Sequence, residues 1–235
     1  MEIQSDVYTI ILLTIILGIG IVAVSKKIDK LNPLEKPTGI AGAVILGVES
    51  VAKSCENSVG KNISYKLAPY VLVLWIYIFT ANICSLFGLT SPTANLSVTL
   101  TLAFITWVLI QIVELKYGGV KAYFHAFIEP LAPMLPMNII GKFSTMISMS
   151  LRLFGNLTCG GIMMQLIYSG TQILSDGIAS LLGASGGVFN FMAPIIAPLL
   201  HAYFDLFSGF VQTLVFVTLT IVLIGNDVPD EIKNS

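Results

Sequence analysis

Apolar residues recur along this chain in runs long enough to cross a lipid bilayer. A helix needs about 20 apolar residues to span a hydrocarbon core of about 30 Å. Three runs fit one crossing each, at residues 7–25, 67–89 and 96–115. We expect each run to form a transmembrane helix. The first should be retained rather than cleaved as a signal peptide, because its lysines follow the apolar run instead of preceding it.

Two later segments are too long for a simple crossing. They cover residues 134–170 and 187–225, and each would be about 55 Å long as a helix. A helix that exceeds the thickness of the bilayer must tilt or break. Glycines within residues 183–187 predict a break between the two segments, and Pro194 and Pro198 predict a kink in the second. The pattern therefore predicts a long, steeply tilted C-terminal helical hairpin.

The composition assigns the whole chain to one membrane domain, residues 1–235. Hydrophobic residues make up 55% of the sequence and charged residues 11%, whereas a soluble domain carries about 25% charged residues. Residues 35–66 mix apolar and charged positions and predict an amphipathic helix at the cytoplasmic surface. We therefore predict an all-α, polytopic integral membrane protein with about five membrane-embedded helices and one surface helix.

Charge and cysteine content exclude several classes of protein. The formal net charge of −1 provides no attraction for nucleic acid. The three cysteines are scattered and form no Cys-x-x-Cys or Cys/His cluster, so neither a disulfide framework nor a metal site is expected. The sequence also lacks a phosphate-binding loop and a nucleophile elbow, so we predict no enzymatic activity and no cofactor.

The lysines predict the orientation of the chain in the membrane. With five crossings, every lysine falls on the same side, in the segments around residues 26–66 and 116–142 and at Lys233. The positive-inside rule makes that side cytoplasmic. We expect a multi-pass protein of a bacterial plasma membrane, with its N-terminus outside and its C-terminus inside.

The only arginine of the chain, Arg152, is a candidate functional residue. It follows Lys142 by ten residues, or about 15 Å of helix, which places it near mid-membrane if Lys142 marks the surface. An arginine there costs about 2.5–3.5 kcal/mol on insertion scales and stays charged. Ser148, Arg152 and Asn156 share one helical face. The alternative is a structural arginine that pairs with an acid or extends to the interface.

A second polar stripe lies on the last predicted helix. His201, Asp205, Ser208 and Gln212 occupy one face of an otherwise apolar segment. A carboxylate within a membrane indicates a functional site by default, and His201 and Asp205 can exchange protons. A polar contact between packed helices is the alternative reading.

Two adjacent glycines, Gly160 and Gly161, follow Arg152 at a distance of two to three turns. Small residues allow a neighbouring helix to approach closely. If the two long helices pack antiparallel, the gap could admit the Asp205 side chain, although helix packing alone explains the glycines equally well.

Several motifs resemble subunit a of F-type ATP synthases, especially bacterial ones. They follow one another in the order and spacing of that family and cover most of the chain. The chain departs from the family at Gly161, where many bacterial members carry a glutamate, and some of those carry a histidine in place of Asp205. The family also has an acid where Gly141 stands here. The matching motifs are Asn82, Ser91–Leu96, Pro136–Ile140, Ser150–Asn156 and Val211–Phe216.

The resemblance implies a non-catalytic stator subunit that lies in the lipid bilayer against a rotating ring of c subunits. It implies peripheral-stalk b subunits and the other ATP synthase subunits as further partners, and a translocated proton or sodium ion. Two offset half-channels would meet the ring on either side of Arg152. Asp205, His201, Ser208 and Gln212 would line the outer half-channel, and Asn156 would help to orient the arginine. An ion-coupled secondary transporter and a purely structural subunit remain the alternatives.

Overall fold

The computed structural model describes residues 5–28, 39–87, 89–128, 132–181, 190, 192–229 and 233. This part of the chain is helical and contains no strand. Within it, four helices are long and apolar enough to cross a membrane. The protein is therefore an all-α, polytopic membrane protein, as the sequence predicts. The four candidate spans are Val7–Ile28, Ile63–Phe87, Leu96–Gly118 and Ala193–Asn226.

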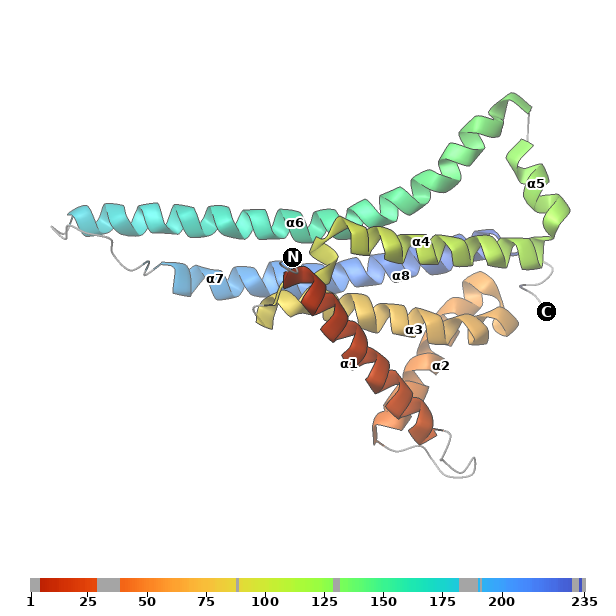
Figure 1. Ribbon diagram of the computed structural model, residues 1–235, viewed down its shortest axis with the longest axis horizontal. Coiled ribbons are helices and arrows are strands. Elements are labelled where there is room, and N and C mark those ends of the chain that lie inside the picture. Colours follow the sequence, from red (N-terminus) through yellow and green to blue (C-terminus); the bar gives the residue numbers. More distant parts are fainter. Residues whose placement is uncertain are drawn as a thin grey trace.

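The helices differ from the predicted segments mainly at their ends (Figure 1). Gly60, with a φ of 83°, separates α2 from α3, so residues 61–66 begin the transmembrane helix instead of ending the surface helix. Helix α6 continues beyond residue 170 to Leu181. The main helices are α1 (Ser5–Ile28), α2 (Gly39–Val59), α3 (Lys61–Ile83), α4 (Leu96–Val113), α5 (Val120–Ile128), α6 (Leu135–Leu181), α7 (Ala193–His201) and α8 (Gly209–Asn226).

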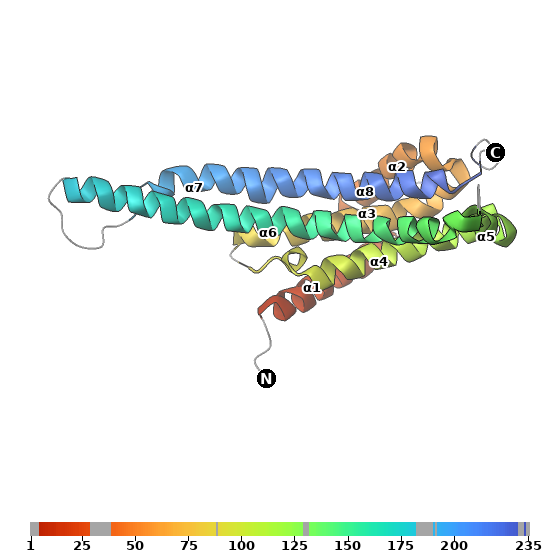
Figure 2. The ribbon, with the colours of Figure 1, turned by 90° about the horizontal axis from the view of Figure 1, so that it is seen from above.

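The C-terminal hairpin is the longest feature of the fold. Helix α6 runs antiparallel to α7 and α8, and the two arms lie side by side in both views (Figures 1 and 2). At about 1.5 Å per residue, the 47 residues of α6 measure about 70 Å, well beyond a bilayer core of about 30 Å. The break predicted at residues 183–187 lies outside the described residues.

The second arm is continuous from Ala193 to Asn226 but not regular throughout. Pro194 lies in the first turn of α7, where its missing N–H costs nothing, and Pro198 lies inside the helix. A wider π-turn, η5, follows at Ala202–Ser208 and joins α7 to α8. Such turns insert an extra residue into a helix and often occur at functional sites.

Helix α6 is not among the four apolar spans. Polar residues such as Arg152, Asn156 and Gln165 interrupt its apolar sequence and lower its mean hydropathy. That α6 crosses the membrane as a fifth helix therefore remains a prediction, and its support is the packing of α6 against the apolar helices. In Figure 1, α3, α4, α8 and the later part of α6 run nearly parallel, while α1 and the first part of α6 run obliquely to them.

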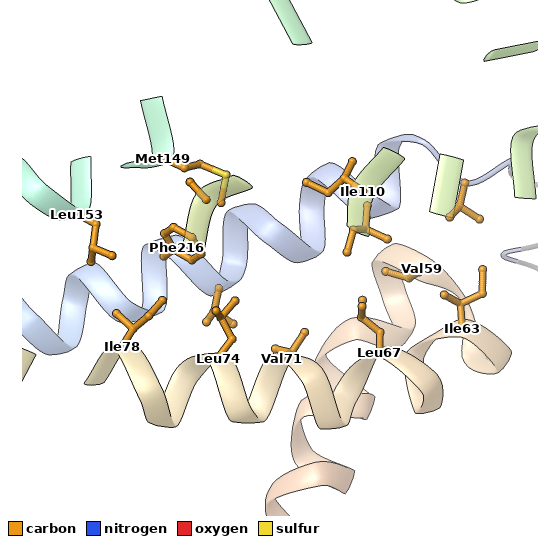
Figure 3. Close-up of a cluster of buried hydrophobic side chains, with 14 residues drawn as sticks. Val59, Ile63, Leu67, Val71, Leu74, Ile78, Ile110, Met149, Leu153 and Phe216 are labelled. Carbon is orange, nitrogen blue, oxygen red and sulfur yellow. The ribbon is translucent and has the colours of Figure 1, made fainter. Parts of the chain in front are cut away.

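The core of the molecule lies where α3 faces α8, α4 and α6 (Figure 3). Leu67, Val71, Leu74 and Ile78 repeat at helical spacing along α3 and belong to one buried cluster with Phe216 of α8. Met149 and Leu153 of α6 join the same cluster, and Leu153 is completely buried. This packing fixes the rotation of α6, and it turns the residue next to Leu153 away from the core.

A buried asparagine ties α3 to the start of α8. Asn82 Nδ2 donates to the carbonyl of Gly209 at 3.2 Å, and Thr93 Oγ1 donates to Asn82 Oδ1 at 2.7 Å. A Cβ atom on Gly209 would lie 3.1 Å from the Cβ of Asn82, so only a small residue fits this approach. The network holds the end of the π-turn against the rest of the bundle.

Candidate functional site

Arg152 points outward from the bundle near the middle of α6. Its neighbour Leu153 is buried in the core, while Arg152 is exposed. Within the described part of the chain, the guanidinium makes no ion pair and no hydrogen bond. Since it cannot lose its proton, this side chain remains a charge without a counter-ion on a surface rich in exposed apolar residues such as Leu151 and Ile147.

The two polar stripes meet one helical turn away from Arg152. Ser208 Oγ donates a hydrogen bond of 2.7 Å to Asn156 Oδ1, which joins η5 to α6. Because the arms are antiparallel, Gln212 lies one turn beyond Ser208, at the level of Arg152. Ser148 is exposed on the far side of Arg152. The polar face of α6 thus turns from the exterior toward the second arm at Asn156.

Two buried polar atoms of the hairpin lack hydrogen-bond partners in the described residues. Gln212 is only 9% exposed, and its Nε2 is unpartnered, as is Thr158 Oγ1. A buried donor without a partner costs about 1–3 kcal/mol, which an ordered water can offset. A water bound to Gln212 Nε2, at the level of Arg152, would satisfy that donor.

Asp205 and His201 form a hydrogen-bonded pair farther along the second arm. His201 Nδ1 lies 2.6 Å from Asp205 Oδ2, and His201 Nε2 lies 3.0 Å from the hydroxyl of Tyr168 on α6. Tyr168 was not singled out in the sequence, because an isolated tyrosine in an apolar run carries no pattern. Only the pairing of α6 with α7 brings it to His201.

The glycine pair behaves differently from the prediction. A Cβ on Gly160 would meet Phe204 at 3.7 Å, so the gap is filled by Phe204 and does not admit Asp205. A Cβ on Gly161 would meet nothing within 4 Å among the described residues, so the predicted close packing of Gly161 stays a prediction. Consecutive helical residues point about 100° apart, and only one of the two glycines can face the second arm.

A second ionised cluster lies on the opposite side of Arg152 along α6. Lys142 Nζ bonds both carboxylate oxygens of Glu114, the first at 2.6 Å, and stands 4.5 Å from the centre of the Tyr123 ring. The pKa of Asp227 is raised from 3.8 to about 6 by burial and by the charge of Glu114, against the opposing effect of Lys142. Glu114 and Asp227 do not stand out in the sequence, because Lys142, the charge beside them, belongs to another helix.

No group of three or more histidine, cysteine or acidic side chains that could hold a metal ion occurs among the described residues. The ionisable groups instead lie along the hairpin: His201 and Asp205 lie on one side of Arg152, and Lys142, paired with Glu114 at the end of α4, lies on the other. Fold and site together define a polytopic membrane protein whose long hairpin carries ionisable side chains on both sides of an unpaired arginine.

The chain belongs to the family described as ATP synthase A chain, that is, subunit a of F-type ATP synthases, whose sequence model matches residues 7–225. This membership sets aside the secondary transporter as an alternative.

Individual relatives support the same assignment. The chain is 31% identical over 181 residues to the "ATP synthase subunit a, sodium ion specific" of Propionigenium modestum, an alignment that covers 70% of this chain and 55% of that protein. It is 30% identical over 203 residues to ATP synthase subunit a of Mycoplasmoides gallisepticum, with 82% and 68% covered. It is 31% identical over 206 residues to that of Pediococcus pentosaceus, with 83% and 82% covered.

Proposed function

We propose that this membrane-sector ion-channel subunit forms the stator side of two offset half-channels. They carry protons, or sodium ions, to and from the carboxylates of a c-subunit ring. The subunit hydrolyses nothing itself. It works with the other ATP synthase subunits, among them the c-ring and the peripheral-stalk b subunits. Each charge that crosses supplies about 2.3 kcal/mol per 100 mV of membrane potential, which drives rotation of the ring.

The observation that carries this proposal is the exposed guanidinium of Arg152 without an anionic partner in the described residues. A permanent charge within a membrane requires a counter-ion, and a passing ring carboxylate would supply one. At 4 Å and an effective dielectric constant of about 20, the pair attracts by about 4 kcal/mol before desolvation. Desolvation offsets much of this attraction, so the carboxylate can leave again.

The same charge separates the two half-channels. A cation that approaches Arg152 is repelled, so ions pass from one side to the other only by riding on the ring. Asp205, His201, Ser208 and Gln212 would line the outer half-channel, and the unpartnered Nε2 of Gln212 supports water there. Asn156, held by Ser208, would help to orient the arginine or a water beside it.

The orientation is proposed from the lysines. Lys116 and Lys121 lie near the end of α4, and Lys61 and Lys66 lie at the start of α3. In Figure 1, these helix ends and the start of α6 lie at the same end of the molecule. We assign that end to the cytoplasmic side of a bacterial plasma membrane, with the N-terminus outside.

The test is Arg152→Ala in the intact synthase, measured as ATP-driven ion pumping in inverted membrane vesicles. Pumping should be lost while the complex still assembles, because the counter-charge for the ring carboxylate is gone. Lys121→Ala removes an exposed cation from α5 and is the matched control, which should pump normally. If Arg152→Ala pumps at the rate of the control, the chain is a structural anchor and the proposal fails.

A further inference from the structure

A line of hydrogen bonds continues outward from Asp205, beyond the residues that the sequence singled out. The Tyr168 hydroxyl lies 3.0 Å from His201 Nε2, and His201 Nδ1 lies 2.6 Å from Asp205 Oδ2. Exposure falls along this line: Tyr168 is 40% exposed, and the side chains of His201 and Asp205 are 37% and 14% exposed. The line therefore leads from an accessible hydroxyl to a shielded carboxylate.

The chemistry of the three groups suits the movement of a proton. Beside a carboxylate, Nδ1 of the neutral imidazole carries the proton, and Nε2 accepts from the tyrosine hydroxyl. A hydroxyl both donates and accepts. When Tyr168 Oη takes the excess proton of a hydronium ion, its own proton moves to Nε2, so the tyrosine is unchanged and a neutral water is left. The imidazolium that results is stabilised by the carboxylate of Asp205.

The backbone of Tyr168 is fixed to the arm that carries His201. Asn190 Nδ2 donates to the carbonyl of Tyr168 at 3.4 Å and to Thr171 Oγ1 at 3.0 Å. Asn190 Oδ1 accepts from the backbone N–H of Ala193 at the start of α7, at 3.0 Å. One side chain thus joins the turn of α6 that bears Tyr168 to the helix that ends at His201, and it holds the hydroxyl and the imidazole in register.

We propose that Tyr168 is a proton-transfer residue of the outer path, whose hydroxyl connects the His201–Asp205 pair to water near the loop of the hairpin. This inference rests on the proposed function. It adds Tyr168 to the residues of the outer half-channel and assigns the proton as the transported ion. The hydroxyl and the imidazole can relay a proton by breaking one O–H or N–H bond as the next one forms. A sodium ion cannot pass in this way and would have to displace the two side chains.

The surroundings of His201 contain few other ionisable groups. On its own arm these are Asp205 and Tyr203. Elements α3 and η1 (Cys84–Phe87) contact the π-turn that carries Asp205, and the titratable side chains at that end of them are Tyr77 and Cys84. Helix α6 also packs against this arm. The charged or titratable side chains of this part of α6 are Arg152, Cys159, Tyr168 and Asp176. Asp176 accepts a hydrogen bond from Gln172 on its own helix. The pH response of the outer path should therefore depend mainly on His201, Asp205 and the hydroxyl that bonds them.

The experiment replaces Tyr168 in the intact synthase and measures ATP-driven proton pumping in vesicles across a range of pH. Tyr168→Phe keeps the ring and removes the relay, so pumping should fall by about tenfold or more, with a changed pH profile. Tyr203→Phe is the matched control, because Tyr203 lies on the same hairpin, is 56% exposed and makes no hydrogen bond among the described residues. It should pump like the unmodified synthase.

A second variant separates proton transfer from packing. Incorporation of 3-fluorotyrosine at position 168 keeps the shape of the side chain and lowers the pKa of its hydroxyl. A relay predicts a displaced pH profile and a changed solvent deuterium isotope effect, and a packing role predicts neither. The inference is overturned if Tyr168→Phe and the fluorinated chain both match the Tyr203→Phe control, or if pumping follows sodium concentration instead of pH. Loss of pumping in Arg152→Ala with unchanged pumping in Tyr168→Phe would overturn this inference alone.

Discussion

Ser208 on the π-turn donates a 2.7 Å hydrogen bond to Asn156 on α6, one helical turn from Arg152. The contact joins the polar stripes of two helices that are far apart in the sequence. It lies where Leu153 anchors α6 in the core and turns Arg152 outward. The bond therefore fixes the distance between the arginine and the second arm of the hairpin.

Removal of this hydrogen bond should weaken ion transport without abolishing it. Asn156→Ala and Ser208→Ala each break the same bond, which is worth about 1 kcal/mol net. Each single variant should pump several-fold more slowly, and the double variant should be no slower than the slower single variant. The rate of ATP-driven pumping in vesicles, compared across the two single variants and the double variant, gives the double-mutant cycle. Additive losses would contradict a shared role of the two residues.

The Glu114–Lys142 pair should be important for the stability of the chain within the complex. Lys142→Gln leaves the buried carboxylate of Glu114 unpaired and should destabilise by about 2 kcal/mol, less than a fully buried pair because Lys142 is 25% exposed. Glu114→Gln should cost less, because Lys142 still contacts the rings of Tyr123 and Phe127.

The thermal midpoint of the purified complex measures both changes. The double variant Glu114→Gln with Lys142→Gln is the control for the loss of charge and should recover most of the stability. Equal midpoints for Lys142→Gln and Glu114→Gln would show that the aromatic contacts contribute nothing.

Asp227 should make stability depend on pH. Its pKa is about 6 in the folded chain and 3.8 as the ordinary value, so the folded state binds the proton more tightly than the unfolded state. The contribution of this group is full below about pH 4 and is lost as pH rises toward 6. Asp227→Asn should therefore raise the thermal midpoint at pH 7.5 and raise it less at pH 5.

The exposed carboxylate of Asp176 provides the control for that experiment. Asp176→Asn should change the midpoint little at either pH. A gain for Asp227→Asn that is the same at pH 5 and at pH 7.5 would exclude titration of Asp227 as its cause.

A close contact between α2 and α8 should make Gly225 intolerant of substitution. A Cβ at this position would lie 2.6 Å from the carbonyl oxygen of Ser58, a backbone atom that cannot move alone. Gly225→Ala should therefore destabilise by about 1–3 kcal/mol. Gly141→Ala is the control, since a Cβ there meets nothing within 4 Å, and it should stabilise α6 by up to about 1 kcal/mol. The thermal midpoint of the complex decides between these outcomes.

The helices and the hairpin could be predicted because bilayer thickness and helical periodicity act locally on the sequence. Asp205 stood out for the same reason, as a charge in an apolar run. The hydroxyl of Tyr168 and the partner of Lys142 could not be predicted, because each depends on which helices pack together. Gly160 and Gly161 look alike in the sequence, and only the rotation of α6, set by Leu153, distinguishes them.

The π-turn was also beyond prediction from the sequence. Pro194 and Pro198 indicated an irregular segment, but the irregularity lies at Ala202–Ser208, after both prolines. The choice between a regular helix and a wider turn depends on contacts at its end, such as the bond from Asn82 to the carbonyl of Gly209.

Because of the wider turn, the direction of every later side chain of the second arm depends on the number of residues in that turn. One extra residue rotates everything that follows by about 100° around the helix axis. The directions in which His201 and Gln212 point around the helix axis thus depend on the number of residues between them as much as on their identity. Deletion of Leu206 would leave His201, Asp205, Ser208 and Gln212 in the chain, yet it would rotate Phe216 out of the core and turn Gln212 to another side of the helix.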